Sequence, residues 1–172
     1  HFDFKKWSEI FPRRLPTFCP GCPHRETLSL LKDLRKTLDK KDIDLISHGD
    51  VGCYSLSFLP PFKEMHNLSA MGQGGALGAG FDLFTTNPSV VLMGDSTFFH
   101  AAMPALVNAV HHQSNMTMVI LDNSGTAMTG FQPHPGIEKN AMGDIAQTID
   151  IQKICEAIGA WVEVSDPFDM EK

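Results

Sequence analysis

The sequence predicts an α/β fold in which a mostly parallel sheet is covered by helices on both faces. Continuous apolar runs, typical of strands buried on both sides, occur at 90–93 and 116–121. Segments with the three- and four-residue apolar spacing of helices alternate with them at 26–38, 101–112 and 149–158. Strands that alternate with helices in this way form parallel sheets in layered domains.

The elements before these strands follow from local composition. Residues 1–18 combine basic residues and prolines in an irregular pattern, which indicates a linker arm, and the domain is expected to span 19–172. A tight Pro-Gly turn lies within 19–23 and precedes the first helix. The apolar stripe of that helix consists of Leu28, Leu31, Leu34 and Leu38. A short strand is expected at 43–47, and a glycine-rich helix at 70–80 that packs closely against the sheet or a ligand.

Composition excludes several classes of function. The chain has 172 residues, 42% hydrophobic content and a net charge of −6, values of a soluble globular protein. A nucleic-acid partner is not expected, because the charge is negative and forms no basic stripe. No apolar run is long enough to span a membrane. The first residues carry neither an initiator Met nor a signal peptide, so we expect a piece of a longer, cytoplasmic protein.

Polar residues follow the two apolar strands at the edge where parallel sheets bind ligands. Gly94, Asp95 and Ser96 follow the first strand, and Asn123 follows the second. A carboxylate and an amide oxygen suit Mg²⁺ bound to a diphosphate, and the carbonyl of Gly125 would complete the protein ligands. The alternative is that Asp95 merely caps the following helix.

Four motifs in order resemble the indolepyruvate ferredoxin oxidoreductases, members of the 2-oxoacid:ferredoxin oxidoreductase superfamily. The motifs are Cys-Pro-Gly-Cys-Pro-His-Arg at 19–25, Gly-Asp-Val-Gly-Cys-Tyr at 49–54, Gly-Asp-Ser-Thr-Phe-Phe-His at 94–100, and Asp-Asn with Thr-Ala-Met-Thr-Gly and Gln-Pro-His-Pro-Gly within 122–136. The matching region of that family is the pyrophosphate-binding domain near the end of the large (alpha) subunit. The resemblance covers residues 15–170, and departures at Ser124, Gly125 and Phe131 leave the aryl specificity open.

The resemblance implies a thiamine-diphosphate-binding fold with the cofactor held through Mg²⁺. Asp95, Asn123 and the Gly125 carbonyl would be the metal ligands. Met71 would prop the cofactor in its bent conformation, although a methionine here is also a common gap filler in helix packing. The residues expected to bind the cofactor are Cys53, Met71, Gly72, Gly94, Asp95, Ser96, Asn123 and Thr126.

The implied reaction is the oxidative decarboxylation of an aryl pyruvate, indolepyruvate first, to its acyl-coenzyme A, with electrons passing to ferredoxin. The family places the catalytic glutamate on a pyrimidine-binding domain of the same or a second subunit. The expected partners are therefore that domain, a small (beta) subunit and ferredoxin, in an oligomer, and the chain by itself is expected to be inactive. Alternatives are a non-redox thiamine-diphosphate decarboxylase or synthase domain, and a zinc or iron–sulfur interaction module.

Cysteines and histidines supply the remaining candidates. Cys19, Cys22 and Cys53 are expected to hold a [4Fe–4S] cluster, to form a disulfide plus a thiol, or to line the site as free thiols. The indolepyruvate branch carries its clusters in a separate ferredoxin-like segment, which this chain lacks. Cys155 lies in a helical stripe and is expected in the core. His24 and His134, in Pro-flanked loops of the motifs, are the catalytic candidates, with structural hydrogen bonding as the alternative.

Overall fold

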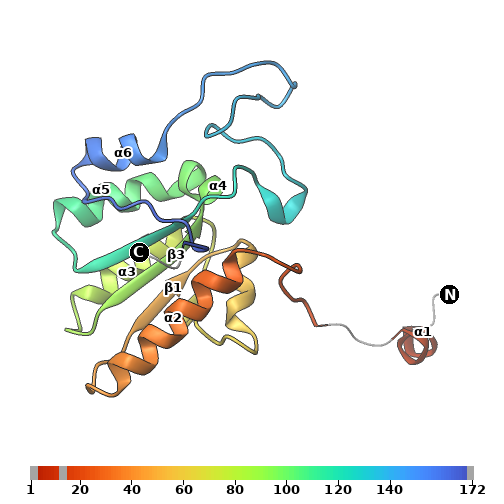
Figure 1. Ribbon diagram of the computed structural model, residues 1–172, viewed down its shortest axis with the longest axis horizontal. Helices are drawn as coiled ribbons and strands as arrows, with labels where there is room; N and C mark the ends of the chain where they lie inside the picture. The colour runs from red at the N-terminus through yellow and green to blue at the C-terminus, as the bar shows by residue number, and fades with distance from the viewer. Residues whose placement is uncertain (1–3, 12–14, 170–172) are drawn as a thin grey trace.

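Four parallel strands form the central sheet, in the order β2-β1-β3-β4 (Figure 1). The computed structural model describes residues 4–11 and 15–169. The strands are β1 (Ile46–Gly49), β2 (Asn67–Leu68), β3 (Ser89–Gly94) and β4 (Met116–Leu121). Every pairing in this sheet is parallel, which confirms the α/β class predicted from the apolar runs.

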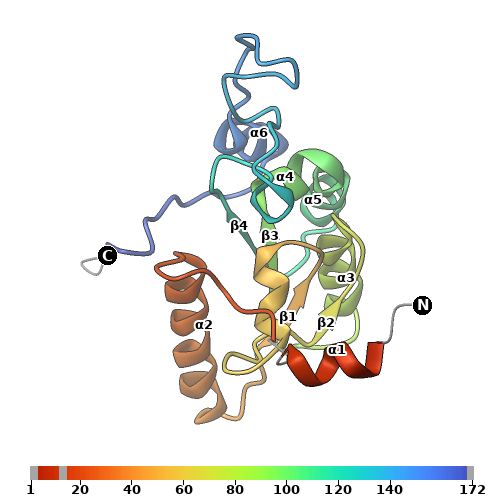
Figure 2. The same ribbon diagram turned by 90° about the vertical axis from the view of Figure 1, so that its right-hand side faces the viewer.

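Helices cover both faces of the sheet, as predicted (Figure 2). Helix α2 (His24–Asp39) lies on one face, and α3 (Gln73–Asp82) and α5 (Met103–His111) lie on the other. Helix α6 (Ile151–Ile158) packs on α5. The shorter helical segments are α1 (Phe4–Ile10), η1 (Cys53–Phe58), α4 (Asp95–Thr97), η2 (Phe98–Ala102) and η3 (Ala127–Thr129). Within the described residues, no helix combines the length and apolarity needed to cross a membrane.

Three elements differ from the expectation. The strand expected at 43–47 runs from Ile46 to Gly49, because its register is set by pairing with β3 from Ser89 onward. The helix expected from residue 101 begins at Asp95, directly after β3, and passes through a π-helical turn before α5. The two-residue strand β2 is too short to leave a periodic pattern in the sequence.

Two smaller expectations were also wrong in part. Helix α1 lies within the segment 1–18 that was expected to be irregular, while 1–3 and 12–14 fall outside the described residues. In α2, Leu28 and Leu31 are buried as predicted, whereas Leu34 is 46% exposed. The buried stripe is therefore interrupted at Leu34, while Leu38 near the end of the helix is partly buried against the core.

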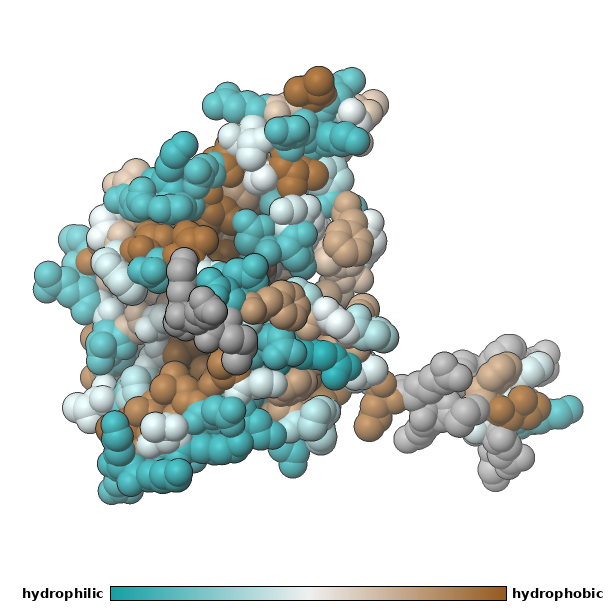
Figure 3. Space-filling model, in the orientation of Figure 1, coloured by the Kyte–Doolittle hydropathy of each residue, from teal (hydrophilic) through white to brown (hydrophobic). Residues whose placement is uncertain are grey.

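The core is centred on β3, which has strands on both sides and helices on both faces. Val91, Leu92 and Met93 are at most 1% exposed, and Phe98 at the following turn is completely buried. Cys155 also packs into this core from α6, as expected. On the face seen in Figure 3, apolar side chains gather between α2 and α6.

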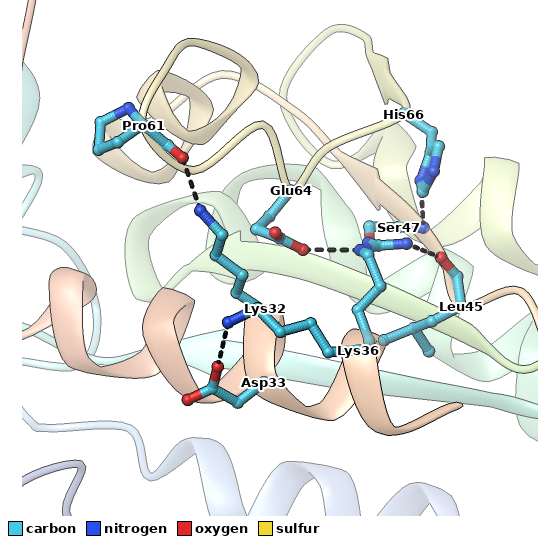
Figure 4. A network of polar contacts seen from close by, with 9 residues as sticks. Lys32, Asp33, Lys36, Leu45, Ser47, Pro61, Glu64 and His66 are labelled. Atoms are coloured by element: carbon cyan, nitrogen blue, oxygen red, sulfur yellow. Dashed lines mark hydrogen bonds and ion pairs between the residues drawn. The ribbon is translucent and has the colours of Figure 1, made fainter. Parts of the chain in front are cut away.

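A buried ion pair fastens α2 to the sheet (Figure 4). Arg35 Nε lies 2.8 Å from Glu64 Oε2, and Glu64 is only 2% exposed. The same guanidinium donates to the carbonyl of Leu45 and, at 2.6 Å, to Ser47 Oγ. The ion pair and the hydrogen bonds offset the cost of burying the Glu64 carboxylate. The network therefore fixes α2, whose first residue is His24, relative to β1.

Helix α3 approaches the sheet so closely that glycine is required at Gly78. A Cβ there would lie 2.7 Å from Cγ2 of Val91, a buried and conformationally restricted side chain. At Gly80 on the same helix, nothing lies within 4 Å of such a Cβ.

We expect Gly78→Ala to lower the free energy of unfolding by about 1–3 kcal/mol through overpacking. Gly80→Ala is the matched control and should raise it by roughly 0.5–1 kcal/mol, because alanine favours the helix. Urea denaturation measures both changes. Equal effects of the two substitutions would contradict the close-packing explanation.

Burial of His48 makes stability depend on pH. His48 lies in β1, where it is completely buried and its ring contacts the ring of Phe81. Desolvation lowers the pKa of His48 below the usual 6.5. As the pH falls below 6.5, His48 is therefore protonated in the unfolded chain but stays neutral in the folded chain, until the pH reaches the lowered pKa of the folded state.

We expect the free energy of unfolding to fall as pH drops below 6.5, with His48 contributing up to about 1.4 kcal/mol per pH unit. His48→Gln should reduce that slope, whatever its effect on stability at pH 7.5. Denaturant titrations between pH 7.5 and 5.5 provide the measurement, and an identical slope in the variant would show that His48 is not the group responsible.

Candidate cofactor site

A pocket lies at the carboxyl ends of β1, β3 and β4, the edge at which parallel sheets bind ligands. Its lining includes most of the residues predicted for the site: His24, Cys53, Met71, Gly94, Asp95, Ser96, Asn123, Gly125 and Thr126. The lining residues not predicted are Val51, Gly52, Tyr54, Thr97, Ala127, Met128 and Thr129. The sequence motifs are thus brought together in space, as their positions after the strands require.

The carboxylate of Asp95 is the centre of the pocket's hydrogen bonding. Its Oδ2 accepts from the backbone N–H groups of Asn123 and Gly125, each at 3.1 Å, and lies 3.0 Å from His134 Nε2. Its Oδ1 accepts from Ser96 N at 2.7 Å. Asp95 is 1% exposed. The carboxylate therefore ties the end of β3 to the loop that follows β4.

These contacts decide between the two interpretations of Asp95. Gly94 occupies the N-cap position, and Asp95 is the first residue inside α4. Its side chain bonds to Ser96 N next to it and otherwise to the loop after β4, rather than to a backbone N–H two or three residues on as a cap would. The helix-cap alternative is wrong.

The amide of Asn123 fits a metal ligand. Its Oδ1 is buried and has no hydrogen-bond partner within the described residues, although Asn123 lines the pocket beside Asp95. An unpartnered buried oxygen is costly unless a ligand completes it. Carboxylate, amide and backbone carbonyl oxygens are the donors that Mg²⁺ prefers. The donor set of Asp95, Asn123 and Gly125 therefore fits the predicted cation.

His134 bonds to the predicted metal ligand, and its own position is fixed from three sides. Its Nδ1 accepts from Gly136 N at 3.0 Å, so Nε2 carries the hydrogen that is donated to Asp95. The ring of Phe99 stacks on it with centroids 5.4 Å apart. The side chain is 5% exposed. This arrangement suits a group that orients Asp95, in the way that outer-shell partners orient metal ligands.

His24, the other catalytic candidate, lines the pocket itself. It begins α2, is 6% exposed, and meets the ring of Phe18 edge-on at 6.3 Å. Burial lowers the pKa of His24, and the negative charge of Asp95 acts in the opposite direction. A neutral imidazole at the pocket wall can donate or accept a single hydrogen bond to a ligand.

A buried polar cluster of Asp50, Tyr54 and Thr97 next to the pocket was not predicted from the sequence. Asp50, which follows β1, is completely buried and accepts a short hydrogen bond from Tyr54 Oη. The same hydroxyl lies 3.2 Å from Thr97 Oγ1. The Gly-Asp pair after a strand, repeated at Gly49-Asp50 and Gly94-Asp95, is the signal that could have drawn attention to Asp50.

The four cysteines are free thiols. Cys53 lines the pocket, Cys22 is half-buried and Cys19 is exposed. Burial raises the pKa of Cys53, and the nearby Cys22 and Cys19 raise it further, so the three thiols lie near one another. In the described part of the chain, no three His, Cys, Asp or Glu side chains are grouped in an arrangement that could hold a metal ion.

The family of the chain follows from comparison with known proteins. Residues 50–172 match the family described as "Thiamine pyrophosphate enzyme, C-terminal TPP binding domain". The chain belongs to this family. The matched region contains the ends of β3 and β4 together with Met71, Asp95 and Asn123, so most of the lining of the pocket lies within the family's TPP-binding domain.

Relatives of this chain align with nearly all of its residues. The indolepyruvate oxidoreductase subunit IorA of Methanothermobacter thermautotrophicus is 41% identical over 94% of this chain and 26% of its own length. The subunit of the same name from Pyrococcus abyssi is 39% identical over 98% of this chain and 27% of its own. The chain thus spans about a quarter of these relatives.

A solved structure shares the fold. It is a 2-oxoglutarate:ferredoxin oxidoreductase from Magnetococcus marinus with 2-oxoglutarate, coenzyme A and succinyl-CoA bound. The match has a TM-score of 0.67 at 21% identity and covers 88% of this chain and 55% of that one. It supports the thiamine-diphosphate-binding fold expected for the family.

Proposed function

We propose that this chain forms the diphosphate- and metal-binding half of the active site of a 2-oxoacid:ferredoxin oxidoreductase that acts on indolepyruvate or a related aryl pyruvate. The observation that carries the proposal is the convergence of Asp95 and the unpartnered Oδ1 of Asn123 on one pocket with Met71. The names of the relatives support the redox class and the aryl substrate.

In this proposal, the Asp95 carboxylate, Asn123 Oδ1 and the Gly125 carbonyl hold Mg²⁺ against the diphosphate. Ser96 and Thr126, in the same pocket lining, donate hydrogen bonds to its oxygens. When bound, thiamine diphosphate supplies the electron sink for the loss of carbon dioxide. Met71 would contact the ring system of the bound cofactor, and the backbone around Gly94 would lie next to the diphosphate.

The two histidines have different roles in this arrangement. His24, neutral and at the pocket wall, donates a hydrogen bond to the substrate's carboxylate or oxo group. His134 acts through Asp95, whose orientation it fixes by its bond at 3.0 Å. We therefore propose a substrate-contacting role only for His24, and a positioning role for His134 in place of the catalytic one expected from the motif.

The rest of the active site is proposed to lie on other polypeptide. A pyrimidine-binding domain would supply the catalytic glutamate, and a small subunit and ferredoxin would complete an oligomeric complex. Coenzyme A would take up the acyl group. Supporting observations are that the relatives are named as subunits and that the matched oxidoreductase structure holds coenzyme A and an acyl-CoA.

A non-redox decarboxylase is the competing function, since it would use Asp95 and Asn123 in the same way. It would release an aldehyde without coenzyme A or an electron acceptor. The relatives' names favour the oxidoreductase, and substrate-dependent ferredoxin reduction that requires coenzyme A, assayed in the full-length subunit with its partner subunits, distinguishes the two.

Replacing Asp95 tests the metal site. In the full-length subunit, Asp95→Asn should weaken Mg²⁺-dependent binding of thiamine diphosphate about a hundredfold or more, because the hard carboxylate is lost. The thermal stabilisation given by cofactor plus Mg²⁺ reports this loss. Asp144→Asn, on an exposed loop, is the control and should bind normally. Equal stabilisation of both variants would refute the site.

Iron analysis tests whether Cys19, Cys22 and Cys53 hold an iron–sulfur cluster. Cys155 packs into the core from α6, and in the described residues no three His, Cys, Asp or Glu side chains are grouped in an arrangement that could hold a metal ion. We therefore propose that Cys19, Cys22 and Cys53 remain thiols, with Cys53 at the pocket, and that electrons leave to clusters elsewhere in the complex. Anaerobically purified chain should contain no iron or acid-labile sulfide. A stoichiometric cluster in this chain would contradict the proposal.

A further inference from the structure

Asp50 is a completely buried carboxylate that the proposed chemistry does not use. It follows β1 and lies beneath the pocket, and it contacts neither a lysine nor an arginine in the described structure. Burial raises its pKa, and hydrogen bonds from Tyr54, Gly72 and Gly74 act against that shift. Burying a carboxylate without a nearby cation is costly. Its role therefore follows from the segments that its hydrogen bonds connect.

On one side, Asp50 holds the turn that presents Met71. Its Oδ2 accepts from the N–H of Gly72 at 3.0 Å, one residue before the start of α3. Gly72 has a φ of 82°, and a Cβ there would lie 2.6 Å from the backbone carbonyl carbon of Ala101. The Asp50 carboxylate and the η2 backbone at Ala101 therefore fix the turn that directly follows Met71.

On the other side, Tyr54 links Asp50 to the residues around Asp95. Its hydroxyl donates to Asp50 Oδ1 and lies 3.2 Å from Thr97 Oγ1. Gly94 and Thr97 flank Asp95 along the chain. The ring is 2% exposed and lies against the backbone of Gly94. Two side chains therefore connect the Met71 turn directly to the strand end that carries Asp95.

We propose that Asp50 and Tyr54 are positioning residues that set the spacing between Met71 and the metal-binding residue Asp95. The inference rests on the proposed function, because it assigns the pair to the geometry of the bound cofactor. The pair matters only for a ligand that contacts both sides at once, such as thiamine diphosphate. Inorganic pyrophosphate, which needs only the Asp95 side, should be much less sensitive to it.

A double-mutant cycle in the full-length subunit tests the proposal, with Kd measured by calorimetry for Mg²⁺–thiamine diphosphate and Mg²⁺–pyrophosphate. Tyr54→Phe removes the hydroxyl that links the two sides and should raise the Kd of thiamine diphosphate about tenfold, the effect of losing a hydrogen bond to a charged group. The Kd of pyrophosphate should change by less than about threefold. In the Met71→Ala background, Tyr54→Phe should add little, because the pair acts through Met71.

The control is Ser55→Ala, in the same 3₁₀ helix η1, whose hydroxyl donates only to the neighbouring carbonyl of Gly52 in the described structure and should leave both Kd values unchanged. If Tyr54→Phe does not fold, Asp50→Asn takes its place in the cycle. Additive effects with Met71→Ala, or equal weakening of both ligands, would overturn the positioning role. If the unmodified protein binds neither ligand with Mg²⁺, the proposed function itself fails, a result distinct from either.

Discussion

One carboxylate joins the two strand ends on which the whole site is built. Asp95 follows β3, and its Oδ2 accepts from backbone N–H groups of the loop after β4. The same oxygen accepts a hydrogen bond from His134 Nε2, so three donors converge on a single atom. A group held in this way is already oriented before a cation arrives, which is the condition for a precise metal site. The unpartnered oxygen of Asn123 lies beside it because the same hydrogen bonds fix that loop.

Much of this architecture could be predicted, because burial on two faces leaves a clear mark in the sequence. The apolar runs at 90–93 and 116–121 correspond closely to β3 and β4, and the polar residues after them had to meet at one edge. The helix start at Asp95 could not be predicted in the same way. Its first turns contain the buried Phe98 and a π-helical segment, whose conformation depends on packing rather than on periodicity.

The site was predictable in its residue types but not in its connections. The resemblance of the Pro-flanked loop to the family motif made His134 a candidate, yet only the folded loop shows that its ring faces Asp95 and stacks on Phe99. Asp50 and Tyr54 have no helical or strand periodicity that marks them as partners. Their hydrogen bonds join segments that lie far apart in sequence, and such contacts arise from the packing of α3 on the sheet.

The position of Asp95 within the chain has a consequence for the order in which the protein acquires its site during synthesis. Its partners lie 28, 30 and 39 residues downstream. A nascent chain that ends before residue 123 contains the residues of β1, β2, β3 and β4 but lacks the three groups that donate to Asp95 Oδ2. Because synthesis runs from the N-terminus, the pocket can close only after β4 and its loop have left the ribosome. A product truncated before residue 123 would therefore leave Asp95 Oδ2 without its donors from the loop after β4.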